Sequence, residues 1–152
     1  MRKALTSRVL VIDDDGGIRE LIKQMLEGRG YSVTSASNGA TGYDLISKNP
    51  FDLVITDIQM NGIDGITLIT RIRLLEDRRA VPCLVITGNT SKVNYERAMG
   101  AGADMVIGKP FDLGTFIMGV EQLLEESLIR SVHTADLESF PRPAVSCPPS
   151  IK

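Results

Sequence analysis

The sequence predicts a single α/β domain in which helices cover both faces of a parallel β-sheet. Short apolar runs rich in Val and Ile alternate five times with segments whose apolar residues recur at helical spacing. The chain has 152 residues, of which 43% are hydrophobic and 24% are charged, so it suits one globular domain with one core. The sequence contains no internal repeat.

Two strand–helix units open the chain. Residues 9–12 are a continuous run of Val, Leu and Ile, which is typical of a strand buried on both faces. The apolar residues after this strand are spaced i, i+3, i+4, i+7 and i+8, which is one face of a helix that ends at Gly28. Residues 31–36 alternate as a strand does, and Asn38 is suited to cap a helix that continues to Lys48.

Two further units follow. Residues 53–56 form the third predicted strand, and a glycine-containing loop that ends at Gly65 leads into the third helix. Residues 81–87 form the fourth predicted strand, with Pro82 confined to its start because proline has no N–H to donate within a sheet. Ser91 opens a fourth helix, whose apolar pattern is weaker.

The last unit begins with a short strand at residues 105–107. Asp112 is suited to cap a final helix whose apolar residues, up to Leu124, lie on one face. Beyond it the helical pattern fades and prolines become frequent. We therefore expect one domain over residues 8–127 and a flexible tail or linker over residues 128–152.

The charge balance argues against direct nucleic-acid binding, because 17 basic and 19 acidic residues give a net charge of -2 and form no basic patch. Cys83 and Cys147 lack the spacing of a metal site, and reduced thiols are the simpler interpretation. No apolar run reaches the length of a membrane span, and the N-terminus lacks the apolar segment of a signal peptide. We therefore expect a cytoplasmic protein without membrane insertion.

Polar residues that could carry chemistry follow the predicted strands. Asp13–Asp15 come directly after the first strand, Asp57 follows the third, Thr87 ends the fourth and Lys109 follows the fifth. Taken singly, the aspartates could belong to solvated turns, Thr87 could be an ordinary strand residue and Lys109 could be an ordinary surface lysine. Because the carboxyl ends of parallel strands meet at one edge of the sheet, together they predict a site.

The residue types of this site fit phosphoryl transfer to an aspartate. Carboxylates this close repel one another unless a cation lies among them, and a small set of hard oxygen ligands favours Mg²⁺. A carboxylate beside Mg²⁺ can attack phosphorus and become an acyl phosphate. Lys109 would supply a further positive charge, and Thr87 a hydroxyl donor, to the phosphoryl oxygens.

Four motifs surround these residues, and their order and spacing are specific. They are Val11–Asp15, Thr56–Gly65, Val85–Gly88, and Gly102–Asp104 leading into Lys109–Phe111. With them, the chain resembles the receiver domain of response regulators, the phosphoacceptor module of two-component and phosphorelay systems. The resemblance implies a flavodoxin-like, doubly wound (βα)5 fold with five parallel strands in the order 2-1-3-4-5. It also implies a stand-alone receiver that acts as a switch and not as an enzyme, with only self-directed phosphoryl transfer and autodephosphorylation.

The resemblance assigns roles at the metal and phosphoryl site. It implies that Asp57 is the phosphoacceptor and that Asp13 and Asp14 hold Mg²⁺, with Asp14 as the direct ligand. Asp57 would share the metal, and the backbone carbonyl of Gln59 would complete its coordination. Mn²⁺ is the alternative metal.

Further matching residues concern the bound phosphoryl group and the signal. Lys109 would pair with a phosphoryl oxygen, and the Lys109–Pro110 bond would be cis. Thr87 would swing towards the phosphoryl group and carry the signal. Gln59 and Asn89 match the two variable positions that tune hydrolysis of the phosphoryl group in this family.

The partners implied by the resemblance are a sensor histidine kinase or a phosphotransfer protein, which would donate a phosphoryl group from phosphohistidine. The downstream partner is not identified by the sequence, and a homodimer stays open. Two departures from the family pattern matter: Asn61 stands where proline is usual, and Val106 stands where many members carry an aromatic residue that moves with the threonine. Valine cannot swing in the same way, so the route by which the signal leaves the site is open.

Two other functions compete with the receiver. Asp13–Gly17 and Val85–Gly88 also resemble motifs of haloacid-dehalogenase-type phosphatases, with Asp13 as nucleophile and Asp15 as acid/base. That interpretation lacks the later acid pair and the cap domain, and it leaves Asp57 unexplained. A phosphate-independent pseudo-receiver that only binds partners is disfavoured by the intact acidic, threonine and lysine residues.

Overall fold

The computed structural model describes residues 6–78 and 80–139, and it gives side-chain surroundings as far as residue 130. The sheet has five parallel strands in the order β2-β1-β3-β4-β5, as the family resemblance implied. The strands are β1 (Arg8–Ile12), β2 (Ser32–Ala36), β3 (Leu53–Thr56), β4 (Cys83–Thr87) and β5 (Met105–Gly108). The helices are α1 (Gly16–Glu27), α2 (Gly39–Lys48), α3 (Gly65–Arg73), α4 (Lys92–Ala101) and α5 (Leu113–Ser139).

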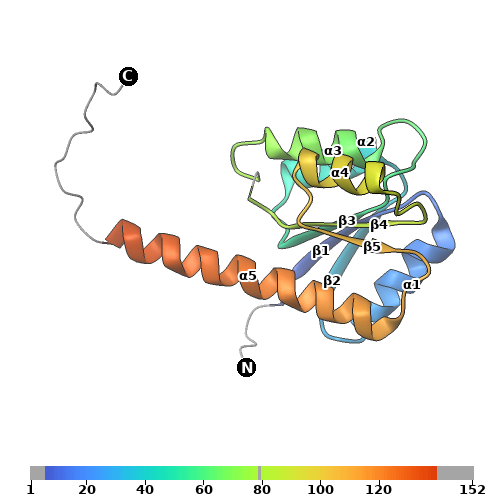
Figure 1. The fold of residues 1–152 in the computed structure, drawn as a ribbon. Coiled ribbons are helices and arrows are strands. Elements are labelled where there is room, and N and C mark those ends of the chain that lie inside the picture. Colours follow the sequence, from blue (N-terminus) through green and yellow to red (C-terminus); the bar gives the residue numbers. More distant parts are fainter. Residues whose placement is uncertain (1–5, 79, 140–152) are drawn as a thin grey trace, which may run out of the picture.

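Helices cover both faces of the sheet (Figure 1). α1 and α5 lie against one face, and α2, α3 and α4 lie against the other. Each interface has its own apolar core, because successive side chains of a strand point to opposite faces. In β1, Val9 and Val11 pack in the core under α1 and α5, while Leu10 and Ile12 pack in the core under the other three helices.

The starts of the helices follow the capping rules. The side chains of four N-cap residues accept a hydrogen bond from a backbone N–H in the first turn of their helix: Asp15, Asn38, Asp64 and Ser91. The predicted caps at Asn38 and Ser91 are confirmed. Asp112 Oδ1 accepts from the N–H of Thr115 at 2.7 Å, so the predicted cap of α5 is confirmed too.

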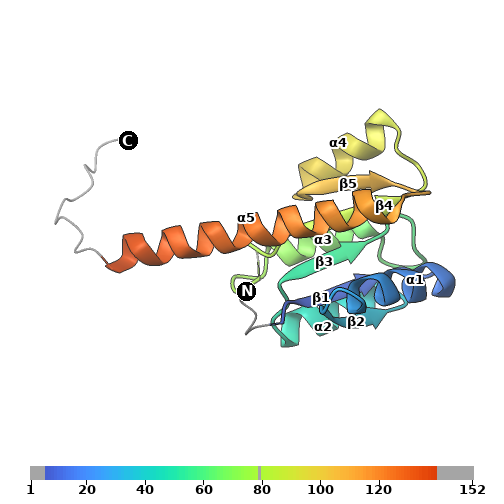
Figure 2. The same ribbon diagram turned by 90° about the horizontal axis from the view of Figure 1, so that it is seen from below.

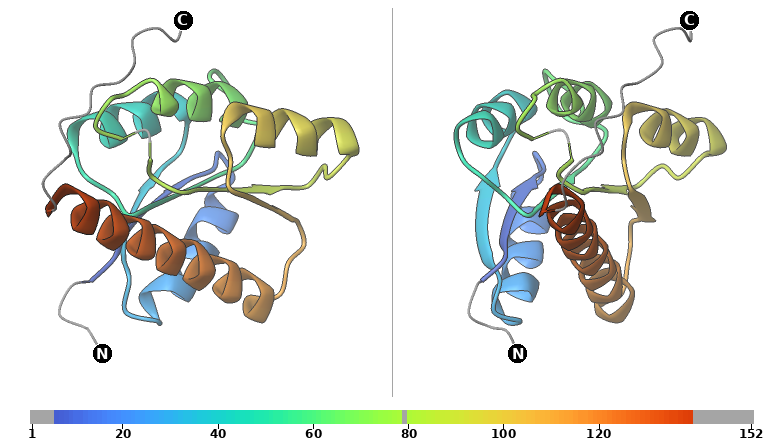
Figure 3. Two further views of the ribbon diagram at one scale, coloured as in Figure 1. Left: turned by 60° about the vertical axis from the view of Figure 1, so that its left-hand side comes forward. Right: turned by 90° about the vertical axis from the view of Figure 1, so that its left-hand side faces the viewer.

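Two boundaries differ from the sequence expectation by more than one residue. β4 begins at Cys83 and not at residue 81, because Pro82 cannot donate, although its carbonyl still accepts from the N–H of Val54 at 3.0 Å. α5 continues past residue 127 to Ser139 and projects beyond the sheet (Figures 2 and 3). Neither glycine nor proline interrupts the chain between Gly119 and Pro141, which allows the helix to continue.

Residues 140–152 of the expected tail lie outside the described residues. Within the described part of the chain, no helix is both long and apolar enough to cross a membrane.

Gly65 gives a prediction about the packing behind the site. A Cβ at this position would overlap the backbone carbonyl oxygen of Asp57 and would lie 3.0 Å from the Cα of Ile58. We expect Gly65→Ala to lower the free energy of unfolding in urea by about 1–3 kcal/mol, because the backbone of a buried strand end cannot move aside. Gly100→Ala is the matched control, since no atom lies within 4 Å of its added Cβ.

Gly100 is the ninth residue of a helix, so its replacement by alanine should raise the free energy of unfolding by up to about 1 kcal/mol. Equal stabilities for the two variants would contradict the close approach of α3 to Asp57.

Candidate functional site

The carboxyl ends of β1, β3 and β5 bring two carboxylates and one ammonium into contact. Lys109 Nζ lies 2.9 Å from Asp57 Oδ2 and 3.0 Å from Asp13 Oδ2. The register of the sheet explains this meeting, because Ile12 pairs with Thr56 and the residues that follow them are neighbours. The structure therefore brings together three of the residues that the sequence predicted for the site.

Asp13 is held through its backbone and through both carboxylate oxygens. Its N–H donates to the carbonyl of Ala36 at 3.2 Å, and its Oδ1 accepts from the N–H of Asp15 at 2.9 Å. The residue is only 2% exposed. Burial raises the pKa of Asp13 above that of an ordinary aspartate, although the hydrogen bonds from Asp15 and Lys109 oppose this shift.

Asp57 has one carboxylate oxygen fixed and one directed to the site. Its N–H donates to the carbonyl of Ile12 at 3.2 Å, which holds its backbone to the end of β1. Its Oδ1 accepts from the N–H of Ile58 at 2.6 Å and from the N–H of Gln59 at 3.3 Å. Its Oδ2 faces Lys109. The orientation of this carboxylate is thus set by the backbone of its own loop.

Lys109 keeps its positive charge although its side chain is only 19% exposed. Burial works against the charged ammonium, but the hydrogen bonds to Asp57 and Asp13 outweigh it and raise the pKa of Lys109 above that of an ordinary lysine. Its backbone N–H donates to the carbonyl of Thr87 at 2.8 Å, which ties the loop after β5 to the end of β4. The Lys109–Pro110 bond is cis, as predicted.

The other predicted site residues surround this cluster without joining it. Thr87 is buried, and its hydroxyl accepts from the N–H of Asn89 at 3.1 Å. Asp14 is exposed, and among the described residues it has no hydrogen-bond or ion-pair partner. Gln59 is exposed, and its backbone contacts Asp57. Val106 is half-buried in β5.

The donor chemistry of the cluster fits a magnesium ion. Two carboxylates share one ammonium, which leaves an excess of negative charge, and Asp14 adds a further carboxylate at the rim. All of these donors are hard oxygens, which Mg²⁺ prefers. In the described part of the chain, however, no three His, Cys, Asp or Glu side chains are already arranged as a metal site. The two buried carboxylates are held instead by Lys109 at Oδ2 and by backbone N–H groups at Oδ1.

Arg19 is a neighbour of the site that the sequence analysis missed. Its Nη1 donates to the backbone carbonyl of Asp13 at 2.8 Å. Long side chains on a helix point back towards its N-terminus. An arginine in the first turn of a helix that follows an acidic run could therefore have indicated this contact from the sequence.

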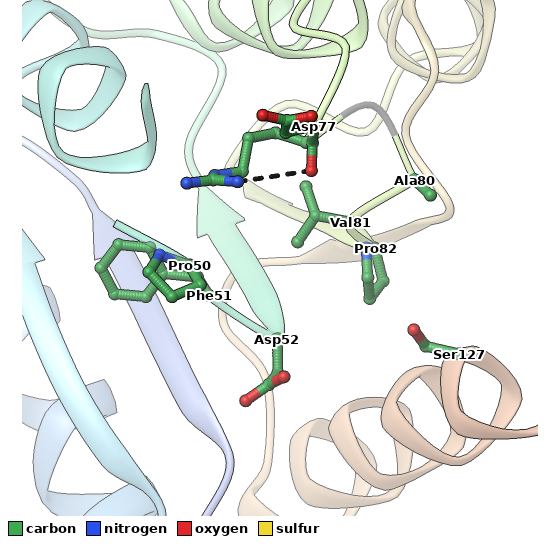
Figure 4. Close-up of a pocket in the computed structure, with 9 residues that line it drawn as sticks. Pro50, Phe51, Asp52, Asp77, Ala80, Val81, Pro82 and Ser127 are labelled. Atoms are coloured by element: carbon green, nitrogen blue, oxygen red, sulfur yellow. Dashed lines mark hydrogen bonds between the residues drawn. The ribbon is translucent and has the colours of Figure 1, made fainter. Parts of the chain in front are cut away.

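A hollow of about 200 Å³ lies at the opposite edge of the sheet (Figure 4). It is lined by residues before β3 and β4, with Ser127 of α5 at its side: Pro50, Phe51, Asp52, Asp77, Arg78, Ala80, Val81, Pro82 and Ser127. The guanidinium of Arg78 donates to the carbonyl of Asp77 there, at 3.4 Å. None of the predicted site residues lines this hollow.

Known proteins share both this sequence pattern and this fold. A family model described as the response regulator receiver domain matches residues 9–121. Response regulator MprA of Mycobacterium sp. (strain KMS) is 35% identical over 120 residues, which are 79% of this chain and 51% of that protein. Transcriptional regulatory protein SrrA of Staphylococcus aureus (strain NCTC 8325 / PS 47) is 27% identical over 132 residues, or 87% of this chain and 54% of that protein. The chain spans about half the length of these curated relatives.

Among solved structures, a response regulator receiver domain protein (CheY-like) from Methanospirillum hungatei JF-1 has a TM-score of 0.78 at 28% identity. The similarity covers 83% of this chain and 99% of that chain.

The buried carboxylate of Asp13 gives a prediction about stability. Folding raises its pKa above the ordinary value of 3.8, so the unfolded chain releases this proton at a lower pH than the folded protein does. The contribution of Asp13 to stability is therefore fully present below the unfolded pKa of 3.8, and it is lost as the pH rises through the raised pKa of the folded protein. At neutral pH and in the presence of a metal chelator, we expect Asp13→Asn to raise the free energy of unfolding, measured in urea, by about 1 kcal/mol.

The gain should shrink as the pH is lowered towards the ordinary value of 3.8, because the folded wild-type protein takes up the Asp13 proton before its unfolded chain does. A loss of stability at neutral pH would show instead that the ion pair with Lys109 outweighs the cost of burial.

Proposed function

The chain belongs to the family of response regulator receiver domains, and from this premise we propose that Mg²⁺-dependent phosphorylation of Asp57 switches its binding to a partner protein. The observation that carries the proposal is the contact of Lys109 Nζ with Asp57 Oδ2 and Asp13 Oδ2, at 2.9 and 3.0 Å. An ammonium at this point would neutralise the charge of a phosphoryl group on Asp57. The protein would act as a signalling switch, with phosphoryl transfer directed only to itself.

We assign the metal to Asp13, Asp14 and Asp57, together with the backbone carbonyl of Gln59. The hard oxygen donors and the excess of negative charge support this assignment. When bound, Mg²⁺ would supply positive charge that stabilises the phosphoryl oxygens. Mn²⁺ prefers similar ligands and should replace it in binding experiments.

The acceptor step would use Asp57 Oδ2. Backbone N–H groups occupy Oδ1, whereas Oδ2 contacts only the ammonium of Lys109 among the hydrogen bonds of the described residues. As the bond between Oδ2 and phosphorus forms, the bond from phosphorus to the imidazole nitrogen of the donor breaks. Lys109 would turn from the carboxylate to a phosphoryl oxygen. The donor would be phosphohistidine on a sensor histidine kinase or a phosphotransfer protein.

The signal would leave the site through Thr87 and the loop before α4. The Thr87 hydroxyl accepts from the N–H of Asn89, and a turn towards the phosphoryl group would break this bond. Asn89 Oδ1 accepts from the N–H of Ser91 at 3.1 Å, and Ser91 caps α4. Val106 offers no aromatic ring to move with Thr87, which favours this loop as the route. Gln59 and Asn89 would also set the lifetime of the phosphoryl group.

The output would be a protein contact. The relative SrrA is named as a transcriptional regulatory protein, and this chain covers 54% of it. Phosphorylation would favour one of two conformations, and a partner would bind that conformation more tightly. The net charge of -2 gives no support for direct contact of this domain with nucleic acid.

The proposal is tested by incubating the protein with Mg²⁺ and a small acyl phosphate, and by locating the added phosphoryl group with mass spectrometry. We expect the label on Asp57 and its loss in Asp57→Asn. Asp13→Asn should slow labelling about 10–100-fold at subsaturating Mg²⁺, because it alters the metal site. Asp77→Asn removes an exposed carboxylate at the opposite edge and should label at the wild-type rate.

The other outcomes distinguish the competing functions. A label on Asp13 that persists in Asp57→Asn would favour the phosphatase-type mechanism. No label, together with no Mg²⁺ binding, would indicate a pseudo-receiver that signals without phosphate.

A further inference from the structure

The backbone carbonyl of Asp13 needs a donor that the sheet does not supply. The ladders of β1 with both neighbouring strands end at Ile12, so this carbonyl lies past the last paired residue. Arg19 Nη1 donates to it at 2.8 Å. Because Asp13 is 2% exposed, loss of Arg19 would leave a buried acceptor without this bond, which is costly.

Arg19 binds the turn between β1 and α1 through both its backbone and its side chain. Its backbone N–H donates to the carbonyl of Asp15 at 3.0 Å, and its guanidinium folds back to Asp13. A Cβ at Gly16 would lie 3.6 Å from Arg19 Nη2, which is ordinary van der Waals contact. The guanidinium therefore packs over the turn that carries the acidic residues.

Arg19 brings a positive charge to this turn without occupying a carboxylate oxygen. Among the ion pairs of the described residues, none joins Arg19 to a carboxylate, whereas Lys109 occupies Oδ2 of Asp13. An arginine that bonds only the backbone can stay in place when another cation takes the carboxylate oxygens. Lys109, in contrast, competes for Asp13 Oδ2 with any other cation that this oxygen binds.

We propose that Arg19 is a positioning residue for divalent-cation binding by Asp13 and Asp14. It fixes the backbone of the acidic turn, so that the carboxylates need less ordering when a cation binds. The proposal rests on the metal site of the proposed function. Its consequence is that loss of Arg19 weakens metal affinity, while phosphorylation of Asp57 at saturating metal persists.

The test measures Mn²⁺ binding from the electron paramagnetic resonance signal of the free ion, without any phosphodonor. Arg19→Met should raise the Kd for Mn²⁺ about tenfold, as loss of a group that orients a metal ligand does. Lys23→Met is the matched control, since it removes the same charge from α1 at a residue whose side chain makes no hydrogen bond or ion pair within the described residues. Its Kd should stay within about twofold of wild type, because the half-buried Lys23 side chain makes no bond to the acidic turn within the described residues.

A kinetic readout separates positioning from a general structural role. The Mg²⁺ concentration that gives half-maximal labelling of Asp57 should rise about tenfold in Arg19→Met, with the maximal rate within about twofold of wild type. Arg19→Lys keeps one donor and should recover part of the lost affinity. Thermal unfolding reports whether each variant is folded, and Arg19→Gln replaces Arg19→Met in the comparison if the latter is not.

Three results would overturn the proposal. Equal Mn²⁺ affinity in wild type and Arg19→Met would show that Arg19 positions nothing, and it would leave the proposed function standing. Equal weakening of Mn²⁺ binding in Arg19→Met and Lys23→Met would show that the effect comes from the change in net charge alone. Absence of Mn²⁺ and Mg²⁺ binding by the wild-type protein would overturn the metal site of the proposed function, and the role of Arg19 with it.

Discussion

One ammonium shared by two carboxylates is the interaction on which the site depends. Asp13 and Asp57 stand side by side at the ends of β1 and β3, and both are buried. Two buried carboxylates repel each other and lose hydration, so they need a positive charge between them. Lys109 supplies it at 2.9 and 3.0 Å. A receiver would exchange this internal cation contact for contacts with phosphoryl oxygens and metal.

The rest of the sheet confines such groups to one edge. Both faces are covered by helices, so strand interiors are apolar, and the buried polar residues of the described chain all lie at carboxyl ends of strands: Asp13, Thr56, Asp57 and Thr87. The close packing of α3 at Gly65 behind Asp57 leaves that strand end little room to move. A rigid sheet with polar strand ends can hold reacting groups in place while the loops around them rearrange.

The two cations at Asp13 differ in what they hold. Lys109 binds a carboxylate oxygen and competes for it with any other cation. Arg19 binds the backbone carbonyl, which no metal site assigned to these side chains requires. The acidic turn would thus keep its shape through a change of charge at the site. The signal would pass instead through Thr87 and the capped start of α4, where a few exposed hydrogen bonds hold the loop.

The sequence by itself determined the order of elements, the burial of the strands and the polar residues at their ends, because periodicity, capping and turn chemistry are local properties. The meeting of Asp13, Asp57 and Lys109 followed from the parallel sheet alone. Tertiary structure decided which oxygen each group uses, that Asp14 lies exposed, and that Arg19 covers the carbonyl of Asp13. The contacts of Lys109 depend on strand register, which joins residues far apart in the chain. The contact of Arg19 is local, but it depends on a side-chain direction that the sequence pattern does not specify.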